Sequence, residues 1–330
     1  MKTRLHQPTP AALRRLAAAL RRGELAAIPT ETVYGLAANA LDARACRKIF
    51  TAKRRPANDP LIVHVPTLTA AEQLAEFNAV ARILARKFWP GPLTLVLPKK
   101  RRVPGIVTSG QTTVALRSPA HPLARRLLRL ARVPLAAPSA NPFGYVSPTT
   151  AEHVLAGLGG RIPHVLDGGP CPVGVESTIV DATDPHRLVI LRPGVVSSRD
   201  LRAALARAGR RATVGSRPRE QVLAPGLLDQ HYSPHTPFSL VARLPRFPPK
   251  NTGLIRWKRP ARGGARAGEF WLSTRGTAAE AARRLYAVLR AADAGGFGLI
   301  VCEKAPGRAG ALGEAINDRL KRAAGKRARR

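Results

Sequence analysis

The segment KRRPANDPLIVHV, residues 53–65, shows the pattern from which the fold of this chain can be predicted. Its first residues close a helix expected over 43–53, and three adjacent cations there complement the negative carbonyl end of the helix dipole. A Pro-containing turn follows. The apolar run 61–65 then has the length and composition of a buried strand. The segment therefore predicts a helix, a turn and a strand, the repeating unit of an α/β protein.

The same alternation extends on both sides of this segment. Apolar periodicity and capping residues predict helices over 10–22, 43–53, 79–88, 122–132, 149–158 and 200–208. Short apolar runs predict strands over 25–28, 61–65, 93–97, 113–116, 134–137, 165–166, 177–180 and 188–191. Residues 1–208 are thus expected to form one α/β domain.

The rest of the chain divides into a connection and a second unit. Residues 209–237 begin polar and basic and become rich in proline, and we interpret them as a linker. Residues 238–330 are expected to form a smaller α/β domain. Its predicted strands are 239–242, 253–256 and 298–302, and its predicted helices are 277–292 and 309–323.

The net charge of the 330-residue chain is +35, from 55 Lys and Arg against 20 Asp and Glu. Such a charge attracts polyanions, so affinity for RNA is expected. Both halves of the chain are basic, which equally fits a compositional bias of the whole sequence. Aromatic residues are only 5%, few for a groove that stacks bases. Charge alone therefore predicts RNA affinity without predicting an RNA-binding fold.

Other whole-chain features exclude several classes of protein. The 3 cysteines, Cys46, Cys171 and Cys302, are far apart and form no CxxC pair, which argues against a disulfide scaffold or a zinc finger. No apolar run approaches the ~20 residues that a membrane helix needs. The N-terminal sequence MKTRLHQPTP lacks the apolar centre of a signal peptide. We therefore expect a cytoplasmic protein without membrane segments.

Polar residues follow several predicted strands, where open α/β sheets bind ligands. They occur in PTETVYGL (29–36), PSAN (138–141), DGG (167–169), GVEST (174–178) and LRPG (191–194). Each could equally be an ordinary turn or helix cap. The sequence has neither a P-loop nor a GxGxxG motif. Asp167 or Glu176 could hold a metal ion, but no carboxylate cluster surrounds them.

Taken together, these segments resemble the threonylcarbamoyl-AMP synthase, or YrdC-like, family. The order and spacing of KRRPANDPLIVHV, WPGPLTLVLP, TTVALRSPAHP, PLAAPSANPFG, SPTTAEHV, GVESTIVD and LRPG carry this resemblance over residues 10–200. APGLLDQHYSPHTPF resembles the linker of the family's two-domain long form. WLSTRG and AINDRLKRAA resemble that form's C-terminal domain.

The resemblance implies a twisted mixed sheet around a large basic cavity, with a smaller Rossmann-like C-terminal domain. It implies synthesis of threonylcarbamoyl-AMP and pyrophosphate from L-threonine, bicarbonate and ATP. A partner system then transfers the threonylcarbamoyl group to the tRNA adenosine beside the anticodon. Mg²⁺ is expected to accompany ATP, without a dedicated protein site. No catalytic nucleophile is implied, which fits a reaction that depends on positioning and electrostatic stabilisation.

The resemblance also assigns binding residues by motif position. The threonine site would comprise Thr32, His64, Arg117, Ala137 and Ser177, with Arg117 pairing the carboxylate. The ATP site would comprise Lys53, Arg55, Asp59, Thr113, Ser139, Ser147, Arg192 and, from the linker, Tyr232. The family usually has Asn at position 59, so Asp59 would repel a nucleotide unless it faces a cation.

Two alternative functions remain open from the sequence. One is a non-catalytic RNA-binding relative that uses the basic cavity, although the linker motif HYSP (231–234) favours a nucleotide enzyme. The other is a carbamoyl-transfer module of hydrogenase maturation. That module needs zinc-finger-like and acylphosphatase-like segments, which this sequence lacks.

Overall fold

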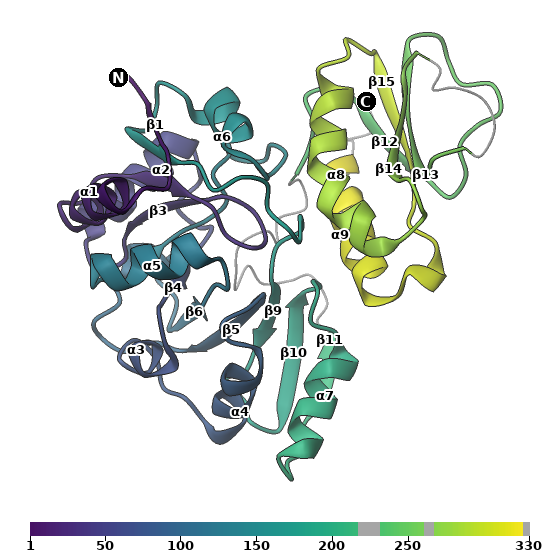
Figure 1. Cartoon of the computed structure of the whole chain (residues 1–330). Coiled ribbons are helices and arrows are strands. Elements are labelled where there is room, and N and C mark those ends of the chain that lie inside the picture. The colour runs from purple at the N-terminus through teal and green to yellow at the C-terminus, as the bar shows by residue number, and fades with distance from the viewer. Residues whose placement is uncertain (217–231, 261–266, 326–330) are drawn as a thin grey trace.

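A computed structural model describes residues 1–216, 232–260 and 267–325 of the chain. They form two α/β domains that lie side by side (Figure 1). The first domain is built on an eleven-stranded mixed sheet, whose strands lie in the order β1-β8-β2-β3-β7-β4-β6-β5-β9-β10-β11. Within the described ranges, no helix is both long enough and apolar enough to cross a membrane.

The strands of this sheet are short, so several of them end near its middle. They are β1 (Arg4–His6), β2 (Ala26–Ile28), β3 (Gly35–Asn39), β4 (Ile62–His64), β5 (Leu93–Pro98), β6 (Thr113–Arg117), β7 (Leu135–Ala136), β8 (His164–Leu166), β9 (Thr178–Asp181), β10 (Arg187–Arg192) and β11 (Thr213–Ser216). The α-helices are α1 (Pro10–Arg21), α2 (Ala43–Lys53), α3 (Leu68–Glu72), α4 (Ala79–Phe88), α5 (Pro122–Ala131), α6 (Ala151–Leu158) and α7 (Ser198–Arg207).

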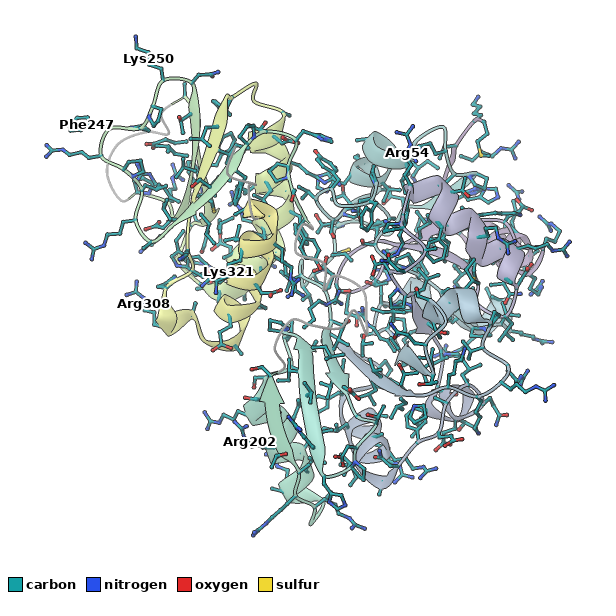
Figure 2. The ribbon with its side chains drawn as sticks, turned by 180° about the vertical axis from the view of Figure 1, so that it is seen from behind. Arg54, Arg202, Phe247, Lys250, Arg308 and Lys321 are labelled. Atoms are coloured by element: carbon teal, nitrogen blue, oxygen red, sulfur yellow. The ribbon has the colours of Figure 1, made fainter. Side chains whose placement is uncertain are left out.

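Capping residues fix both ends of helix α2. The carboxylate of Asp42 accepts hydrogen bonds from the first backbone N–H groups of the helix. Arg54 ends it in the left-handed conformation, with φ of 54°. The chain reverses there, so Lys53 and Arg55 are buried while Arg54 lies at the surface (Figure 2). The C-terminus of this helix thus directs two cations inward.

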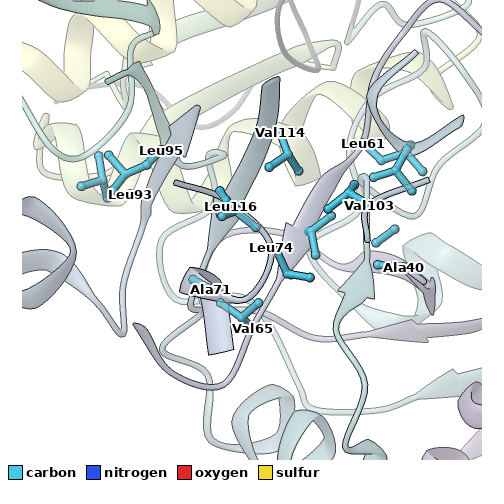
Figure 3. Packing of buried hydrophobic residues seen from close by; sticks show 14 of the residues in the cluster. Ala40, Leu61, Val65, Ala71, Leu74, Leu93, Leu95, Val103, Val114 and Leu116 are labelled. Carbon is cyan, nitrogen blue, oxygen red and sulfur yellow. The ribbon is translucent and has the colours of Figure 1, made fainter. Parts of the chain in front are cut away.

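Aliphatic side chains between the sheet and its helices form the main core. Leu61, Val65, Leu74, Leu95 and Leu116 pack together there and are nearly inaccessible to solvent (Figure 3). Burial of a leucine side chain stabilises the fold by about 1.5–3 kcal/mol. This rigid core fixes the strand ends from which the polar residues of the site project.

The strand and helix predictions are largely confirmed, and the exceptions have a physical pattern. The missed elements β1, β3, β11 and α3 are short, small-residue-rich or partly exposed, so they carry little apolar periodicity. Strand β11 pairs in parallel with β10. The first domain therefore extends to Ser216, past the boundary expected at 208. Residues 217–231 of the predicted linker lie outside the described residues.

The C-terminal domain contains a four-stranded parallel sheet in the order β12-β15-β13-β14. Its strands are β12 (Phe238–Val241), β13 (Thr252–Lys258), β14 (Glu269–Ser273) and β15 (Leu299–Glu303). Its helices are α8 (Ala278–Asp293) and α9 (Gly310–Ala324), which lie between this sheet and the first domain (Figure 1). The predicted small α/β domain is confirmed, with β14 as an additional strand.

The two domains are in intimate contact. At Gly174, φ is +83°, and an added Cβ would lie 2.3 Å from the backbone oxygen of Ala282 on α8. Val33, Val146 and Val175 of the first domain share one apolar cluster with residues of α8 and α9. The C-terminal domain therefore packs directly on the GVEST loop of the first.

Candidate active site

A basic cavity lies where the ends of several strands of the large sheet meet the domain junction. Its lining residues are Thr30, Thr32, Val33, Gly35, Arg55, Ile62, His64, Arg117, Ala137, Pro138, Ser139, Glu176, Arg192 and Tyr232. The space between its walls is about 480 Å³. With three arginines and one glutamate in its lining, the cavity is basic, as the resemblance implies.

Three guanidinium groups reach this cavity from distant parts of the chain. Arg55, Arg117 and Arg192 are 6%, 4% and 3% exposed, respectively. Arg55 follows α2, whereas Arg117 and Arg192 end β6 and β10. Buried cations are costly unless paired. The groups that pair with each arginine therefore show how its positive charge is balanced and its side chain is oriented.

Arg117 is held rigidly at one side of the cavity. Its Nη2 lies 2.6 Å from Glu31 Oε1, and its Nη1 donates to Thr32 Oγ1 at 2.9 Å. Burial alone would raise the pKa of Glu31, but the adjacent Arg117 outweighs this effect and lowers it. Glu31 is therefore an ionised partner that fixes the guanidinium beside the Thr32 hydroxyl.

His64 lies beside Arg117, because β4 and β6 are parallel neighbours in which these two residues are paired. Burial, reinforced by the Arg117 charge, lowers the pKa of His64 to about 3. Its Nδ1 has no hydrogen-bond partner among the residues that the structure describes. His64 therefore offers the cavity a neutral imidazole with an available ring nitrogen.

The neutral state of His64 predicts an acid-sensitive contribution to stability. In the unfolded chain the imidazole has a pKa near 6.5. Below that pH the unfolded state binds a proton, whereas His64 in the folded state remains unprotonated. Stability is therefore lost as the pH falls from about 6.5 toward 3, by about 2 kcal/mol at pH 5. Urea unfolding at pH 7 and pH 5 should show a smaller loss in His64→Gln than in the unmodified chain. Equal losses would contradict the assignment.

Arg55 forms the opposite side of the cavity and resolves the question raised by Asp59. Its Nη2 lies 2.9 Å from Asp59 Oδ2, and its Nε and Nη2 donate to the carbonyl oxygens of Asp59 and Pro60. Asp59 is fully buried and does not line the cavity. Its negative charge therefore faces the Arg55 cation.

Lys53, which is predicted to lie near the phosphates, is not part of the cavity lining. Its Nζ donates to the carbonyl oxygens of Ser139 and Asn141. Burial and the nearby Arg55 hold the pKa of Lys53 well below its ordinary value. The lysine thus anchors the PSAN turn, which places Ser139 in the cavity wall.

Three further predicted contacts also lie outside the cavity lining. The Ser177 hydroxyl is engaged by Thr94 at 2.8 Å and by Arg192 at 3.3 Å. The Ser147 hydroxyl donates to Glu176 at 2.7 Å. Thr113 begins β6, at the opposite end of the strand from Arg117. The first two support cavity residues, whereas Thr113 lies four residues before Arg117 and is not part of the cavity lining.

Some cavity residues were not predicted as site residues. Thr30 accepts backbone hydrogen bonds and lies 2.9 Å from the Thr32 hydroxyl, which it orients. Glu176 lies in the cavity wall, although the sequence suggested only a possible metal ligand. Within the described ranges, no group of three or more His, Cys, Asp or Glu residues is placed to hold a metal ion.

Comparison with known proteins supports one family. A family model named Sua5/YciO/YrdC and described as "Telomere recombination" matches residues 18–194. A model described as "Threonylcarbamoyl-AMP synthase, C-terminal domain" matches residues 196–325. The chain is 40% identical to the threonylcarbamoyl-AMP synthase of Pyrococcus abyssi over 324 residues, which cover 93% of this chain and 92% of the relative. It is 38% identical to the Bacillus subtilis protein of that name over 328 residues, which cover 94% and 92% of the two chains.

A solved structure agrees over almost the whole length. The structure described as P. abyssi Sua5 complexed with L-threonine has a TM-score of 0.86 and 36% sequence identity, with 98% of each chain covered. Both the cavity-forming domain and the C-terminal domain are included in this match. The chain therefore belongs to the threonylcarbamoyl-AMP synthase family, in its two-domain form.

Proposed function

We propose that this protein is a nucleotidyltransferase that makes L-threonylcarbamoyl-AMP and pyrophosphate from L-threonine, bicarbonate and ATP. The observation that carries the proposal is the convergence of Arg55, Arg117 and Arg192 in one cavity of a chain that belongs to this family. ATP, bicarbonate and the threonine carboxylate are all anionic. A cavity that gathers them needs several permanent cations, and arginine remains charged even when buried.

The threonine end of the cavity is the side that contains Arg117. The guanidinium is already oriented by Glu31 and Thr32, so it can receive a carboxylate with little loss of side-chain entropy. The Thr32 hydroxyl and the neutral His64 supply hydrogen bonds for the rest of the amino acid, and Ala137 adds a small apolar contact. The structure of the P. abyssi relative complexed with L-threonine supports threonine as a substrate of this protein.

The nucleotide end is the side that contains Arg55, Ser139, Arg192 and Tyr232. In the reaction that we propose, the threonine amine and bicarbonate form a carbamate with loss of water. A carbamate oxygen then attacks the α-phosphorus of ATP, and the bond from that phosphorus to the bridging oxygen breaks. Pyrophosphate leaves with the bond's electron pair. Arg55 and Arg192 would stabilise the negative charge on the phosphates.

Mg²⁺ would enter with ATP as part of the substrate and neutralise the leaving pyrophosphate. We further propose that the product passes to a tRNA-modifying transferase system in the cytoplasm, where ATP and tRNA are both present. The +35 net charge supports attraction to tRNA during this transfer.

The decisive experiment measures pyrophosphate release by the purified protein supplied with Mg-ATP, labelled bicarbonate and L-threonine. We expect release only when threonine is present, together with incorporation of the label into an adenylate. Omission of bicarbonate should abolish release beyond the traces of dissolved CO₂. Threonine-independent release, or no release at all, would instead favour the alternative of a non-catalytic RNA-binding protein.

A further inference from the structure

A buried ion pair links the C-terminal domain to the cavity. Arg319, on α9, has no exposed surface, and its Nε lies 3.1 Å from Oε2 of Glu176. Its Nη2 also donates to the Glu176 backbone oxygen at 3.4 Å, and its Nη1 donates to the Pro193 carbonyl. Glu176 is part of the cavity wall, and Pro193 directly follows the lining residue Arg192. A residue of the second domain thus reaches the wall of the first domain's site.

The carboxylate of Glu176 is held in one orientation by three side chains. Tyr286, on α8, donates to its Oε2 at 2.8 Å, and Ser147 donates to its Oε1 at 2.7 Å. Burial alone would raise the pKa of Glu176, but Arg319 and then Arg192 outweigh it and lower it. Glu176 therefore carries a full negative charge in the wall of a cavity that, in the proposed function, binds the polyphosphate of ATP.

The charges around this carboxylate determine whether the wall repels or accepts an anion. Among the described residues, the cations that act on this carboxylate are Arg192 from β10 and Arg319 from α9. Asp318, which is 3.2 Å from both Arg319 and Arg322, lies on the far side. Arg319, from the C-terminal domain, balances the negative charge of Glu176. Without it, the carboxylate would be balanced by Arg192, whose charge would then no longer favour a phosphate.

Arg319 also reaches the linker residue in the cavity wall. Its guanidinium lies 5.8 Å from the ring centre of Tyr232, and this ring stacks on Tyr286 at 5.7 Å. Tyr232 is therefore enclosed between the cavity and two residues of the C-terminal domain. The same pair of residues, Arg319 and Tyr286, supports both Glu176 and Tyr232.

We propose that Arg319 is a positioning residue for the nucleotide, which cancels the charge of Glu176 and so couples ATP binding to docking of the C-terminal domain. This inference rests on the proposed function, because it assumes that the cavity binds ATP. It assigns the second domain a direct electrostatic role in the site. Threonine, which is held at the opposite side by Arg117, should be affected little.

The test compares Arg319→Met with the double variant Glu176→Gln/Arg319→Met in the full chain. For Arg319→Met we expect the KM for ATP in pyrophosphate release to rise at least about tenfold, with the KM for threonine changed less than about twofold. The double variant removes both charges, so its KM for ATP should return to within about threefold of that of Glu176→Gln alone. Calorimetric titration with a non-hydrolysable ATP analogue should show the same pattern.

Two controls separate this role from a structural one. Lys321→Met removes a positive charge from an exposed position of the same helix (Figure 2) and should leave both KM values unchanged. Gly174→Val forces α8 away from the GVEST loop and reports the effect of undocking, through its thermal unfolding and its KM values. If Arg319→Met leaves the KM for ATP unchanged, or the double variant remains as impaired as Arg319→Met, the proposal is overturned. Failure of the unmodified protein to bind the ATP analogue would instead contradict the proposed function.

Discussion

Arg117→Ala is expected to lower kcat/KM for L-threonine by at least about 100-fold, because it removes two charge-assisted hydrogen bonds to the substrate carboxylate. Each such bond contributes about 1.5–3 kcal/mol, and about 1.4 kcal/mol corresponds to a factor of ten. The KM for ATP should change far less, since we assign the nucleotide to Arg55 and Arg192, which are separate residues of the cavity lining. Pyrophosphate release at varied threonine and fixed ATP measures the effect.

The neighbouring carboxylate needs its own control. Arg117 and Glu31 are both buried, so removal of the arginine alone leaves an uncompensated charge that can destabilise the fold. Glu31→Gln/Arg117→Ala removes both charges and should unfold nearer the temperature of the unmodified protein while remaining inactive with threonine. Arg117→Lys keeps the charge but loses the planar fork, so intermediate activity is expected. Full activity in any variant that lacks a cation at position 117 would refute the carboxylate assignment.

How far the sequence predicts this site depends on how each residue is positioned. The family resemblance assigns His64 and Arg117 by motif position, and the pairing of β4 with β6 places them side by side. Ser139 follows the strand β7 and likewise lines the cavity. All three lie in or soon after short strands, where strand pairing fixes the place of the side chains.

Other predicted residues lie outside the cavity lining, because their positions depend on contacts that no local pattern encodes. Lys53 and Arg55 are two residues apart in the same basic run, yet only Arg55 lines the cavity. Arg54 has a left-handed conformation between the two cations. Lys53 is hydrogen-bonded to the carbonyl oxygens of the PSAN turn, whereas Arg55 lines the cavity. Arg319 lies in a helix whose sequence reads simply as basic and amphipathic. Its role depends on domain docking, which brings it to Glu176, 143 residues earlier in the chain.

Arg55→Met is expected to abolish measurable ATP use and also to destabilise the protein by about 3–5 kcal/mol, the usual cost of leaving one partner of a buried ion pair alone. The stranded partner is Asp59, which is completely buried and loses the guanidinium at 2.9 Å. Burial raises the pKa of Asp59, with Arg55 opposing, so loss of Arg55 should raise this pKa further and favour proton uptake. Urea unfolding measures the first effect and ATP titration the second.

The double variant Arg55→Met/Asp59→Asn separates folding from binding. Asparagine keeps the size of the side chain and removes the buried charge, so most of the lost stability should return. ATP use should not return, because the Arg55 guanidinium is itself part of the cavity lining that we assign to the nucleotide. Recovery of both properties would mean that Arg55 serves only to neutralise Asp59. Recovery of stability alone would establish that its guanidinium acts on the nucleotide.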